Sequence, residues 1–295
     1  MQEHFLKISA VVFPVFTIIG IGYIFARIKR LSLEPIIEVL LYLTIPALVI
    51  SSLVNKSLVI NDLLLVSLAA CAVVFGTGAM SWVYLRLIKR SELRGFYLPA
   101  MFMNSGNMSF PLALLAFGAA GLTVAVLYYL AISLLVYSLG IYIAKGRGGF
   151  AEIFKLPLIY AAAIGLVINL TAIRLPDPLI TTFDMLGAAT IPMMQISLGY
   201  RLHSASLKEP GISLAGSLIR LAGGFLVAWA VVSLFGIEGL NRKIILLSST
   251  MPSAVINFVV SHKYKVDSDL VASIVAMSTV LSVISTSLLL LWIMD

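Results

Sequence analysis

The stretch that decides the fold is residues 95–144, which read GFYLPAMFMNSGNMSFPLALLAFGAAGLTVAVLYYLAISLLVYSLGIYIA. These fifty residues contain no Asp, Glu, Lys, Arg or His. A transmembrane helix needs about 20 apolar residues, so the stretch is too long for one crossing and long enough for two. The glycines at 118 and 121 mark the expected tight turn between the two crossings.

The rest of the chain has the same apolar character. Hydrophobic residues make up 61% of the 295 residues and charged residues only 11%, against about 25% charged in soluble domains, which excludes a soluble protein. The apolar runs do not alternate with polar residues, so they predict helices rather than barrel strands. We expect an all-α integral membrane protein with ten transmembrane helices, at residues 8–27, 35–54, 62–86, 95–118, 120–144, 156–173, 178–201, 211–236, 243–262 and 269–294.

The basic residues predict how the chain is oriented. They occur in small groups between the apolar runs, which is typical of membrane loops and excludes nucleic acid as the main partner of a chain with net charge +7. If the spans alternate in direction, the loops after the odd-numbered spans carry 14 bases and the other side carries five. The five are Lys7, Lys56, Arg174, Arg242 and Lys243. The positive-inside rule therefore predicts a multi-pass protein of the plasma membrane with both termini outside the cell.

An internal repeat divides the chain into two halves. The letters TIP at 44–46 and IS at 50–51 recur as TIP at 190–192 and IS at 196–197, an offset of 146 residues. The same offset lays spans one to five over spans six to ten, so we expect one repeat at 1–146 and the other at 147–295. Because five is odd, the two halves insert with opposite orientation, which is the inverted-repeat arrangement of secondary transporters.

Two spans have polar centres that coincide under this repeat: MNSGNMSFP at 103–111 in span four and SSTMPSAVIN at 248–257 in span nine. Glycine and proline there predict interrupted helices, whose freed backbone groups need protein or a water-filled cavity around them. Small-residue patches can also serve packing alone, but the clustered amides favour a binding site for an anion at the new helix N-termini. The candidate substrate-binding residues are Asn104, Ser105, Gly106, Asn107, Thr250, Met251, Ser253 and Asn257, with Gln195 of span seven, and the helix-break prolines are Pro111 and Pro252.

Three ionisable residues lie within the spans or at their margins and are candidates for coupling or charge balance. Glu38 and Asp184 occupy matching positions near the start of spans two and seven. They either reach the membrane interface or form a symmetry-related pair of proton sites. Arg220 lies ten residues into span eight, where it either extends toward the cytoplasm or neutralises an anion or a carboxylate.

At these polar centres the sequence resembles the auxin efflux carrier family, which includes plant auxin carriers and bacterial malonate and malate transporters. The matching residues are Asn104 with Pro111, then MPS at 251–253, FVV at 258–260, Tyr264 and DL at 269–270. The resemblance implies ten helices in two inverted five-helix repeats, with spans four and nine broken and crossing. It also implies that spans three to five and eight to ten form a transport domain, which moves against a scaffold of spans one, two, six and seven.

The resemblance places Asn104 where the plant members have a substrate-contacting asparagine, and Pro111 and Pro252 on the crossover prolines. Asn257 falls where plant carriers tend to have proline. The similar bile-acid sodium symporters ligate sodium with a glutamate and glutamines around span nine. The present chain has no acid between Ile244 and Ser261, which argues against sodium coupling.

We expect a carrier that moves a small organic carboxylate by an elevator type of alternating access, with a homodimer through the scaffold. The alternatives are a sodium-coupled symporter of the bile-acid type, or a channel or sensor on the same scaffold. An enzyme is not expected, because the chain lacks Gly-x-Ser-x-Gly and His-Glu-x-x-His motifs. No cofactor or metal site is expected either, since the lone Cys71 has no Cys or His cluster around it.

Overall fold

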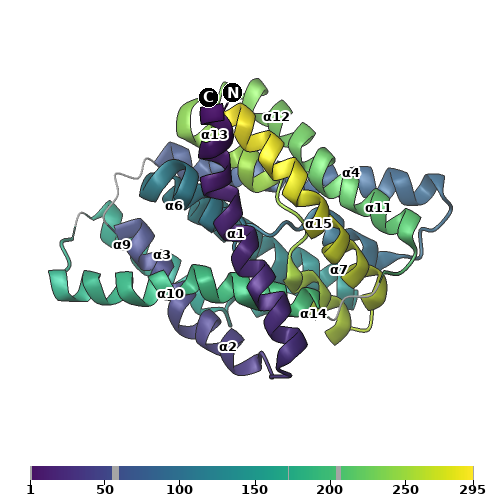
Figure 1. Ribbon diagram of the computed structural model, residues 1–295, viewed down its shortest axis with the longest axis horizontal. Helices are drawn as coiled ribbons and strands as arrows, with labels where there is room; N and C mark the ends of the chain where they lie inside the picture. The colour runs from purple at the N-terminus through teal and green to yellow at the C-terminus, as the bar shows by residue number, and fades with distance from the viewer. Residues whose placement is uncertain (1, 55–59, 172, 204–206, 295) are drawn as a thin grey trace.

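The structure is a computed structural model that describes residues 2–54, 60–171, 173–203 and 207–294. Regular structure within these ranges is helical, apart from one isolated antiparallel bridge between Met103 and Ser253 (Figure 1). The first half contains α1 (Gln2–Ile28), α2 (Glu34–Val39), η1 (Leu40–Thr44), α3 (Ile45–Val54), α4 (Ile60–Leu87), η2 (Arg94–Phe96), α5 (Tyr97–Met101), α6 (Ser109–Leu135), η3 (Val136–Gly140) and α7 (Ile141–Lys145). The second half contains α8 (Phe150–Ile153), α9 (Pro157–Leu170), α10 (Asp177–Leu202), α11 (Pro210–Leu218), η4 (Ile219–Gly223), α12 (Gly224–Leu234), α13 (Gly239–Ser249), α14 (Val255–Lys263) and α15 (Ser268–Ile293).

Seven helical stretches among the described residues are long and apolar enough to cross a bilayer, whereas the sequence predicted ten spans. The seven are Leu6–Ile28, Glu34–Val54, Asn61–Leu87, Ser109–Lys145, Asp177–Leu202, Pro210–Leu234 and Ser268–Ile293. The difference arises where helices are short or interrupted. Expected span six is the 14-residue α9, and expected span nine is divided between α13 and α14, of 11 and 9 residues.

The stretch Ser109–Lys145 is not one straight helix. Gly118 has φ 68° and ψ −164°, far from helical values, so α6 consists of two helices joined at a kink. A residue with a side chain is disfavoured at positive φ, and glycine is not. The kink falls at the start of the glycine pair that the sequence marks as a turn.

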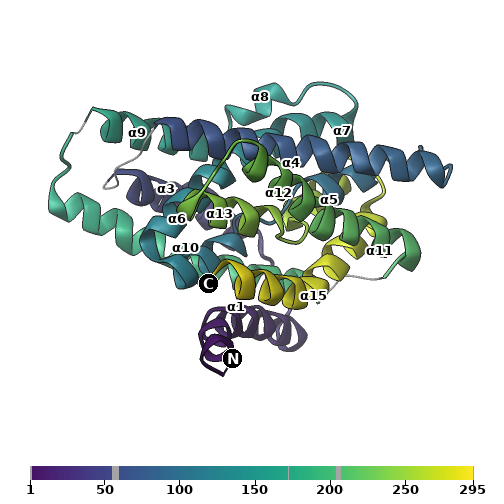
Figure 2. The same cartoon turned by 90° about the horizontal axis from the view of Figure 1, so that it is seen from above.

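The helices form two packed groups. In one group, α1 packs against α10, and α3 packs against both α9 and α10. In the other, α4, α6, α11, α12, α13 and α15 pack against one another, as Figures 1 and 2 show. Gly22 of α1 lies against the backbone of Ile196, and Gly199 of α10 lies against the backbone of Ile19, so that a Cβ at either position would overlap a carbonyl group. Small residues at such crossings let membrane helices approach closely.

One end of the molecule gathers the loops that follow the odd-numbered expected spans. The Tyr200 hydroxyl donates to the carbonyls of Lys29 and Leu31, at 3.1 and 2.9 Å. The Gly95 N–H donates to Asp267 Oδ2 at 2.8 Å, and Lys145 Nζ lies 6.0 Å from the Tyr264 ring centroid.

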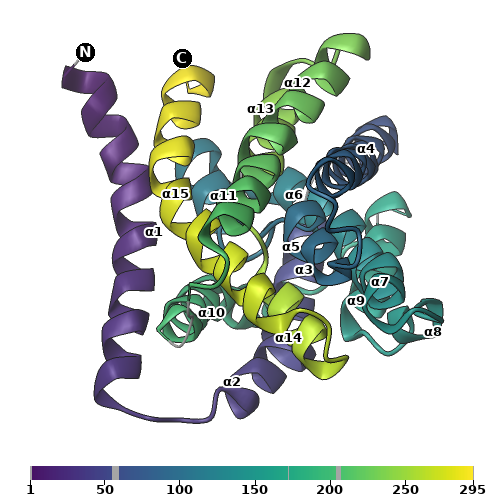
Figure 3. The ribbon, with the colours of Figure 1, turned by 90° about the vertical axis from the view of Figure 1, so that its right-hand side faces the viewer.

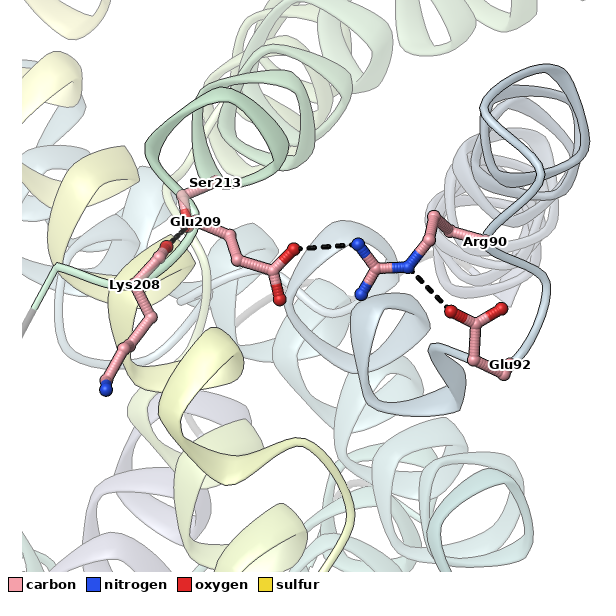
Figure 4. A network of polar contacts seen from close by, with 5 residues as sticks. All are labelled: Arg90, Glu92, Lys208, Glu209 and Ser213. Carbon is pink, nitrogen blue, oxygen red and sulfur yellow. Dashed lines mark hydrogen bonds and ion pairs between the residues drawn. The ribbon is translucent and has the colours of Figure 1, made fainter.

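The ion pairs of Arg90 join two more of these loops. Arg90 contacts Glu92 at 2.6 Å and Glu209 at 3.0 Å, so the loop after α4 meets the segment that leads into α11 (Figure 4). The Ser213 hydroxyl donates to the Lys208 carbonyl and fixes the start of α11, while the Lys208 side chain extends away from Arg90. The hydrogen bond to Glu92 is the main reason that the pKa of Arg90 is raised. The pKa of Glu92 is lowered, first by a hydrogen bond from its own backbone N–H and then by the hydrogen bond from Arg90.

The other end gathers the remaining loops. Asn241 Nδ2 donates to Asp62 Oδ1 at 2.8 Å, Asn169 Nδ2 donates to the Leu53 carbonyl at 2.7 Å, and Lys243 Nζ lies 5.8 Å from the Phe117 ring centroid. The start of α1 and the end of α15 lie on one side of the molecule (Figure 3). Lys56, one of the bases used to predict the orientation, lies outside the described residues.

Candidate functional site

The two polar centres leave helical geometry and pair with each other. The chain is non-helical between the end of α5 at Met101 and the start of α6 at Ser109, and again between the end of α13 at Ser249 and the start of α14 at Val255. The Asn104 N–H donates to the Pro252 carbonyl at 2.7 Å, and the Ala254 N–H donates to the Phe102 carbonyl at 3.1 Å. These bonds satisfy backbone groups that would otherwise be unpaired at the centre of the molecule.

The two prolines occupy different places at the breaks. Pro252 lies within the extended segment, where it needs no helical N–H and its carbonyl accepts the bond from Asn104. Pro111 is the third residue of α6 and is therefore in the first turn, where a missing N–H costs no hydrogen bond. The helix is thus interrupted before Pro111 rather than at it.

Arg220 donates hydrogen bonds to carbonyls at the C-terminal ends of α5 and α13. Its guanidinium is fully buried, and Nη1 donates to the carbonyls of Ala100 at 3.1 Å and Met101 at 2.7 Å. Nη2 donates to the Ser249 carbonyl at 2.8 Å. Within the described part of the chain no carboxylate forms an ion pair with Arg220, and the side chain does not extend to the surface. Extension toward the cytoplasm and pairing with a described carboxylate, two of the roles that the sequence suggested for Arg220, are therefore not observed, and neutralisation of an anion stays a prediction. The acceptors are main-chain oxygens.

A cavity of about 380 Å³ lies beside the crossing segments. It is lined by 103–107 and 254–256, and by side chains from four regions of the helical groups: Leu40 and Leu41 of η1, Tyr129 and Ser133 of α6, Met194 and Ser197 of α10, and Val259 and Lys263 of α14. The volume is within the range of small-molecule sites, whose walls are mostly apolar with a few polar groups. A small ligand would therefore lie between α10 and the crossing segments.

The predicted residues of span four all line this cavity. They are Asn104, Ser105, Gly106 and Asn107. Asn104 Oδ1 accepts the Asn107 N–H at 3.2 Å, whereas the buried Asn104 Nδ2 has no partner among the described residues. Asn107 Nδ2 donates to the Met194 carbonyl at 3.2 Å and so links the crossing to α10. A buried amide donor without a partner is costly, which makes Asn104 Nδ2 the group best placed to bond a ligand.

The predicted residues of span nine, and Gln195, are not among those that line the cavity. Thr250 Oγ1 donates back to the Leu246 carbonyl at 2.8 Å. Asn257 Nδ2 donates to the Phe102 carbonyl at 2.8 Å and to Ser253 Oγ at 3.0 Å, so this amide stabilises the crossing itself. Met251 and Gln195 are buried, and both polar atoms of the Gln195 amide lack a partner among the described residues.

Charged residues occur where the cavity lining extends to the helix ends. Arg201 near the end of α10, Lys263 at the end of α14 and Glu152 of α8 all contribute to it. The Lys155 ammonium, 3.0 Å from Glu152, donates a hydrogen bond to this carboxyl and lowers its pKa below the ordinary value. Sequence reasoning used Arg201 and Lys263 only as loop bases. Their position just beyond spans seven and nine was the available signal that they could reach the site.

The two acidic candidates differ in their surroundings. Asp184 accepts a short hydrogen bond from Ser51. The repeat offset relates Asp184 to Glu38 and Ser51 to Ser197, but Glu38 is exposed and Ser197 Oγ has no partner among the described residues. Ser197 lines the cavity, whereas Ser51 and Asp184 do not. The Ser51–Asp184 hydrogen bond between α3 and α10 therefore has no equivalent at Ser197 Oγ.

Paired helix breaks beside a cavity with a few polar groups, in a chain of long apolar helices, are features of membrane transport proteins. The family model described as membrane transport protein matches residues 150–290. A protein of Methanothermobacter thermautotrophicus described as an uncharacterized transporter is 30% identical over 297 residues, covering 96% of this chain and 98% of the relative. An uncharacterized transporter of Methanocaldococcus jannaschii is 28% identical, covering 94% of this chain and 96% of the relative.

The chain belongs to this family of membrane transport proteins, the auxin efflux carrier family that its motifs resemble. It is accordingly a multi-pass membrane transporter.

Proposed function

We propose that the protein is a secondary carrier that moves a small organic carboxylate across the plasma membrane. The observation that carries the proposal is that Asn104, whose buried Nδ2 has no partner among the described residues, lines a cavity together with Arg201 and Lys263. An amide donor near the crossing and cations near the helix ends suit an anion with an apolar body. The start of α14 adds the partial positive charge of a helix N-terminus.

The proposed topology has ten crossings in two inverted repeats, with α5 and the first part of α6 as span four and α13 and α14 as span nine. The contacts between loops support it, because loops after odd-numbered spans contact one another at one end and the others meet at the opposite end. Both chain termini on one side fit an even number of crossings (Figure 3). The bases then place the termini outside the cell.

The proposed mechanism is an elevator movement of the crossing domain, formed by spans three to five and eight to ten, against the scaffold of spans one, two, six and seven. The cavity lies between these groups, since its lining combines η1 and α10 with the crossing segments. The lining charges lie near the ends that the bases assign to the cytoplasm, so this arrangement faces inward. A homodimer through the scaffold is proposed from the resemblance alone.

Transport by purified protein in liposomes tests the proposal. A thermal-shift screen with mono- and dicarboxylates selects the substrate, and radiolabelled uptake is then measured with and without the unlabelled compound inside the liposomes. A carrier gives saturable uptake that internal substrate accelerates. Uptake without saturation or counterflow would indicate a channel, and ligand binding without any flux would indicate a sensor.

Asn104→Ala removes the unpartnered donor and is expected to reduce uptake at least about tenfold, since a hydrogen bond to a charged group contributes about 1.5–3 kcal/mol. Thr250→Ala is the matched control from the other crossing segment, because its hydroxyl already bonds its own helix. We expect it to retain most of its uptake. Equal uptake by the wild type and Asn104→Ala would contradict the site, with folding checked by thermal unfolding of both variants.

A further inference from the structure

The guanidinium of Arg220 occupies the place where two helix ends meet. Its acceptors are the last two carbonyls of α5 and the last carbonyl of α13. These carbonyls have no partner within their own helices, because a helix always leaves its final carbonyls unpaired. Arg220 therefore binds both halves of the crossing at once, from a third element, η4.

The carbonyls at this point complement the charge of a guanidinium. Unpaired carbonyls at a helix C-terminus carry partial negative charge, and those that end α5 and α13 both accept hydrogen bonds from Arg220. A guanidinium stays protonated in proteins and supplies one positive charge in a planar fork of donors. No described carboxylate pairs with it, which leaves the two helix ends as its counter-charge.

The surrounding residues leave room for the guanidinium at the helix ends. A Cβ on Gly224 would overlap Arg220 Nη2 and the Ser249 carbonyl oxygen, so the backbone at this position must lack a side chain. The Tyr128 hydroxyl and Ser249 Oγ form a hydrogen bond of 2.8 Å next to the same helix end. Main-chain carbonyl oxygens are also ligands for hard cations such as sodium, but here their lone pairs face the guanidinium.

The donor set does not fit a soluble cation. The carboxylate that a sodium site would use is missing from residues 244–261, and three carbonyls at the crossing already accept bonds from Arg220. We propose that Arg220 is a tethered cation that takes the place of a soluble coupling cation at the crossing, so that transport proceeds without sodium. This inference rests on the proposed function, and it makes Arg220 a positioning residue that acts through the main chain of both broken helices.

Thermal unfolding of the purified full chain tests the proposal without any substrate. The wild type is compared with Arg220→Ala in sodium, potassium and N-methylglucamine chlorides of equal ionic strength, and with guanidinium chloride added at millimolar concentrations. We expect the wild type to unfold at the same temperature in all of them. Arg220→Ala is expected to unfold at a lower temperature and to regain part of that loss with guanidinium, which can occupy the vacated site.

Uptake in liposomes gives the second readout. Replacing sodium is expected to change wild-type uptake less than about twofold, whereas a coupling cation would change substrate affinity about fivefold or more. Uptake by Arg220→Ala is expected to be at least about tenfold lower than that of the wild type and to rise when guanidinium is added. Uptake by Arg220→Lys is expected to be higher than uptake by Arg220→Ala. Arg86→Ala removes an exposed base and serves as the control.

The outcomes separate the two proposals. If the unfolding temperature or the uptake of the wild type depended on sodium, the proposal that Arg220 is a tethered cation would be wrong. It would also be wrong if the Arg220→Ala variant neither lost stability nor responded to guanidinium. Absence of carboxylate flux by the wild type would overturn the proposed function, while the unfolding series would still decide the role of Arg220. If the Arg220→Ala variant does not fold, the proposal is decided by the Arg220→Lys variant and by comparing the wild type in sodium, potassium and N-methylglucamine chlorides.

Discussion

Asn104 takes part in two different sets of bonds at the crossing. Its backbone N–H holds the Pro252 carbonyl, and its side-chain oxygen accepts the Asn107 N–H. These bonds fix the amide, so that its remaining donor, Nδ2, is oriented before a ligand arrives. A group that is held in place in the empty site loses little entropy on binding, which favours affinity. The arrangement of the amide thus follows from the break in the helix.

Lys263 offers a prediction at the scale of one residue. Its exposed ammonium contributes to the cavity lining at the end of α14, so it should attract an anion through a screened charge interaction. Lys263→Gln is expected to raise the KM for a dicarboxylate about fivefold, equivalent to about 1 kcal/mol. Uptake kinetics at low and high salt measure this effect, which should shrink as salt rises.

Lys265→Gln is the control for this substitution, because Lys265 lies two residues away and does not line the cavity. Equal KM values for the wild type and Lys263→Gln at low salt would show that the base has no part in binding.

At the scale of helices, close contacts between backbones define the first packed group. The crossing of α1 and α10 depends on glycine at two places, one on each helix. Without side chains at these places the two helices gain dispersion contacts along their length, which is the main source of helix association in lipid. The second group is joined at its centre by hydrogen bonds such as that between Ser109 Oγ and Ser248 Oγ at 2.7 Å.

Gly22 and Gly20 of α1 provide a matched pair for testing this packing. A Cβ at Gly22 would overlap the Ile196 backbone, whereas a Cβ at Gly20 would meet no atom within 4 Å. Gly22→Ala is expected to destabilise the protein by about 1–3 kcal/mol through overpacking. Gly20→Ala should be neutral or stabilising by up to about 1 kcal/mol, because alanine favours the helix. Thermal unfolding in detergent compares the two, and a loss of stability in Gly20→Ala alone would contradict the packing described.

Features of single helices could be predicted from the sequence, whereas contacts between helices could not. The helical, apolar character of the chain, the kink at Gly118 and the positions of the two breaks are local properties of apolar runs, glycines and prolines, so they could be predicted from the sequence. The number of spans could not be confirmed in the same way, because seven long apolar helical stretches are found where ten were expected. The partners of Arg220 could not be predicted, because every residue carries a carbonyl and the sequence does not distinguish one from another. That Asn104 lines the cavity whereas Thr250 and Asn257 do not also depends on how two distant segments cross. That arrangement is set by packing between the halves.

At the scale of the whole molecule, the loops divide into two sets that lie at opposite ends. One set contains Arg90, Lys145 and Asp267, and the other contains Asp62 and Asn241. Residues joined by such contacts must lie on one side of a bilayer. The division supports the proposed alternation of the spans, and the choice of which side faces the cytoplasm rests on the distribution of bases.

This division predicts the labelling of single cysteines. Cys71 is the only cysteine, so Cys71→Ser gives a cysteine-free background in one step. Arg242→Cys is then expected to react with an impermeant maleimide on intact cells, and Lys265→Cys only after the membrane is opened. Labelling of both from outside would contradict the proposed alternation of the spans, and the reverse pattern would invert the orientation.

The pairing of Met103 with Ser253 also has a consequence for synthesis of the chain. The two residues are 150 positions apart, and ribosomes add about 5–20 residues per second. The first crossing segment therefore waits about 8–30 s for its partner, and during that time its open backbone groups and the ends of α5 and α6 have no bonds from the second half. The first half alone is thus an unfinished folding unit that must be protected in the membrane until the second half arrives. Insertion factors that retain nascent helices would act on this protein chiefly during that interval.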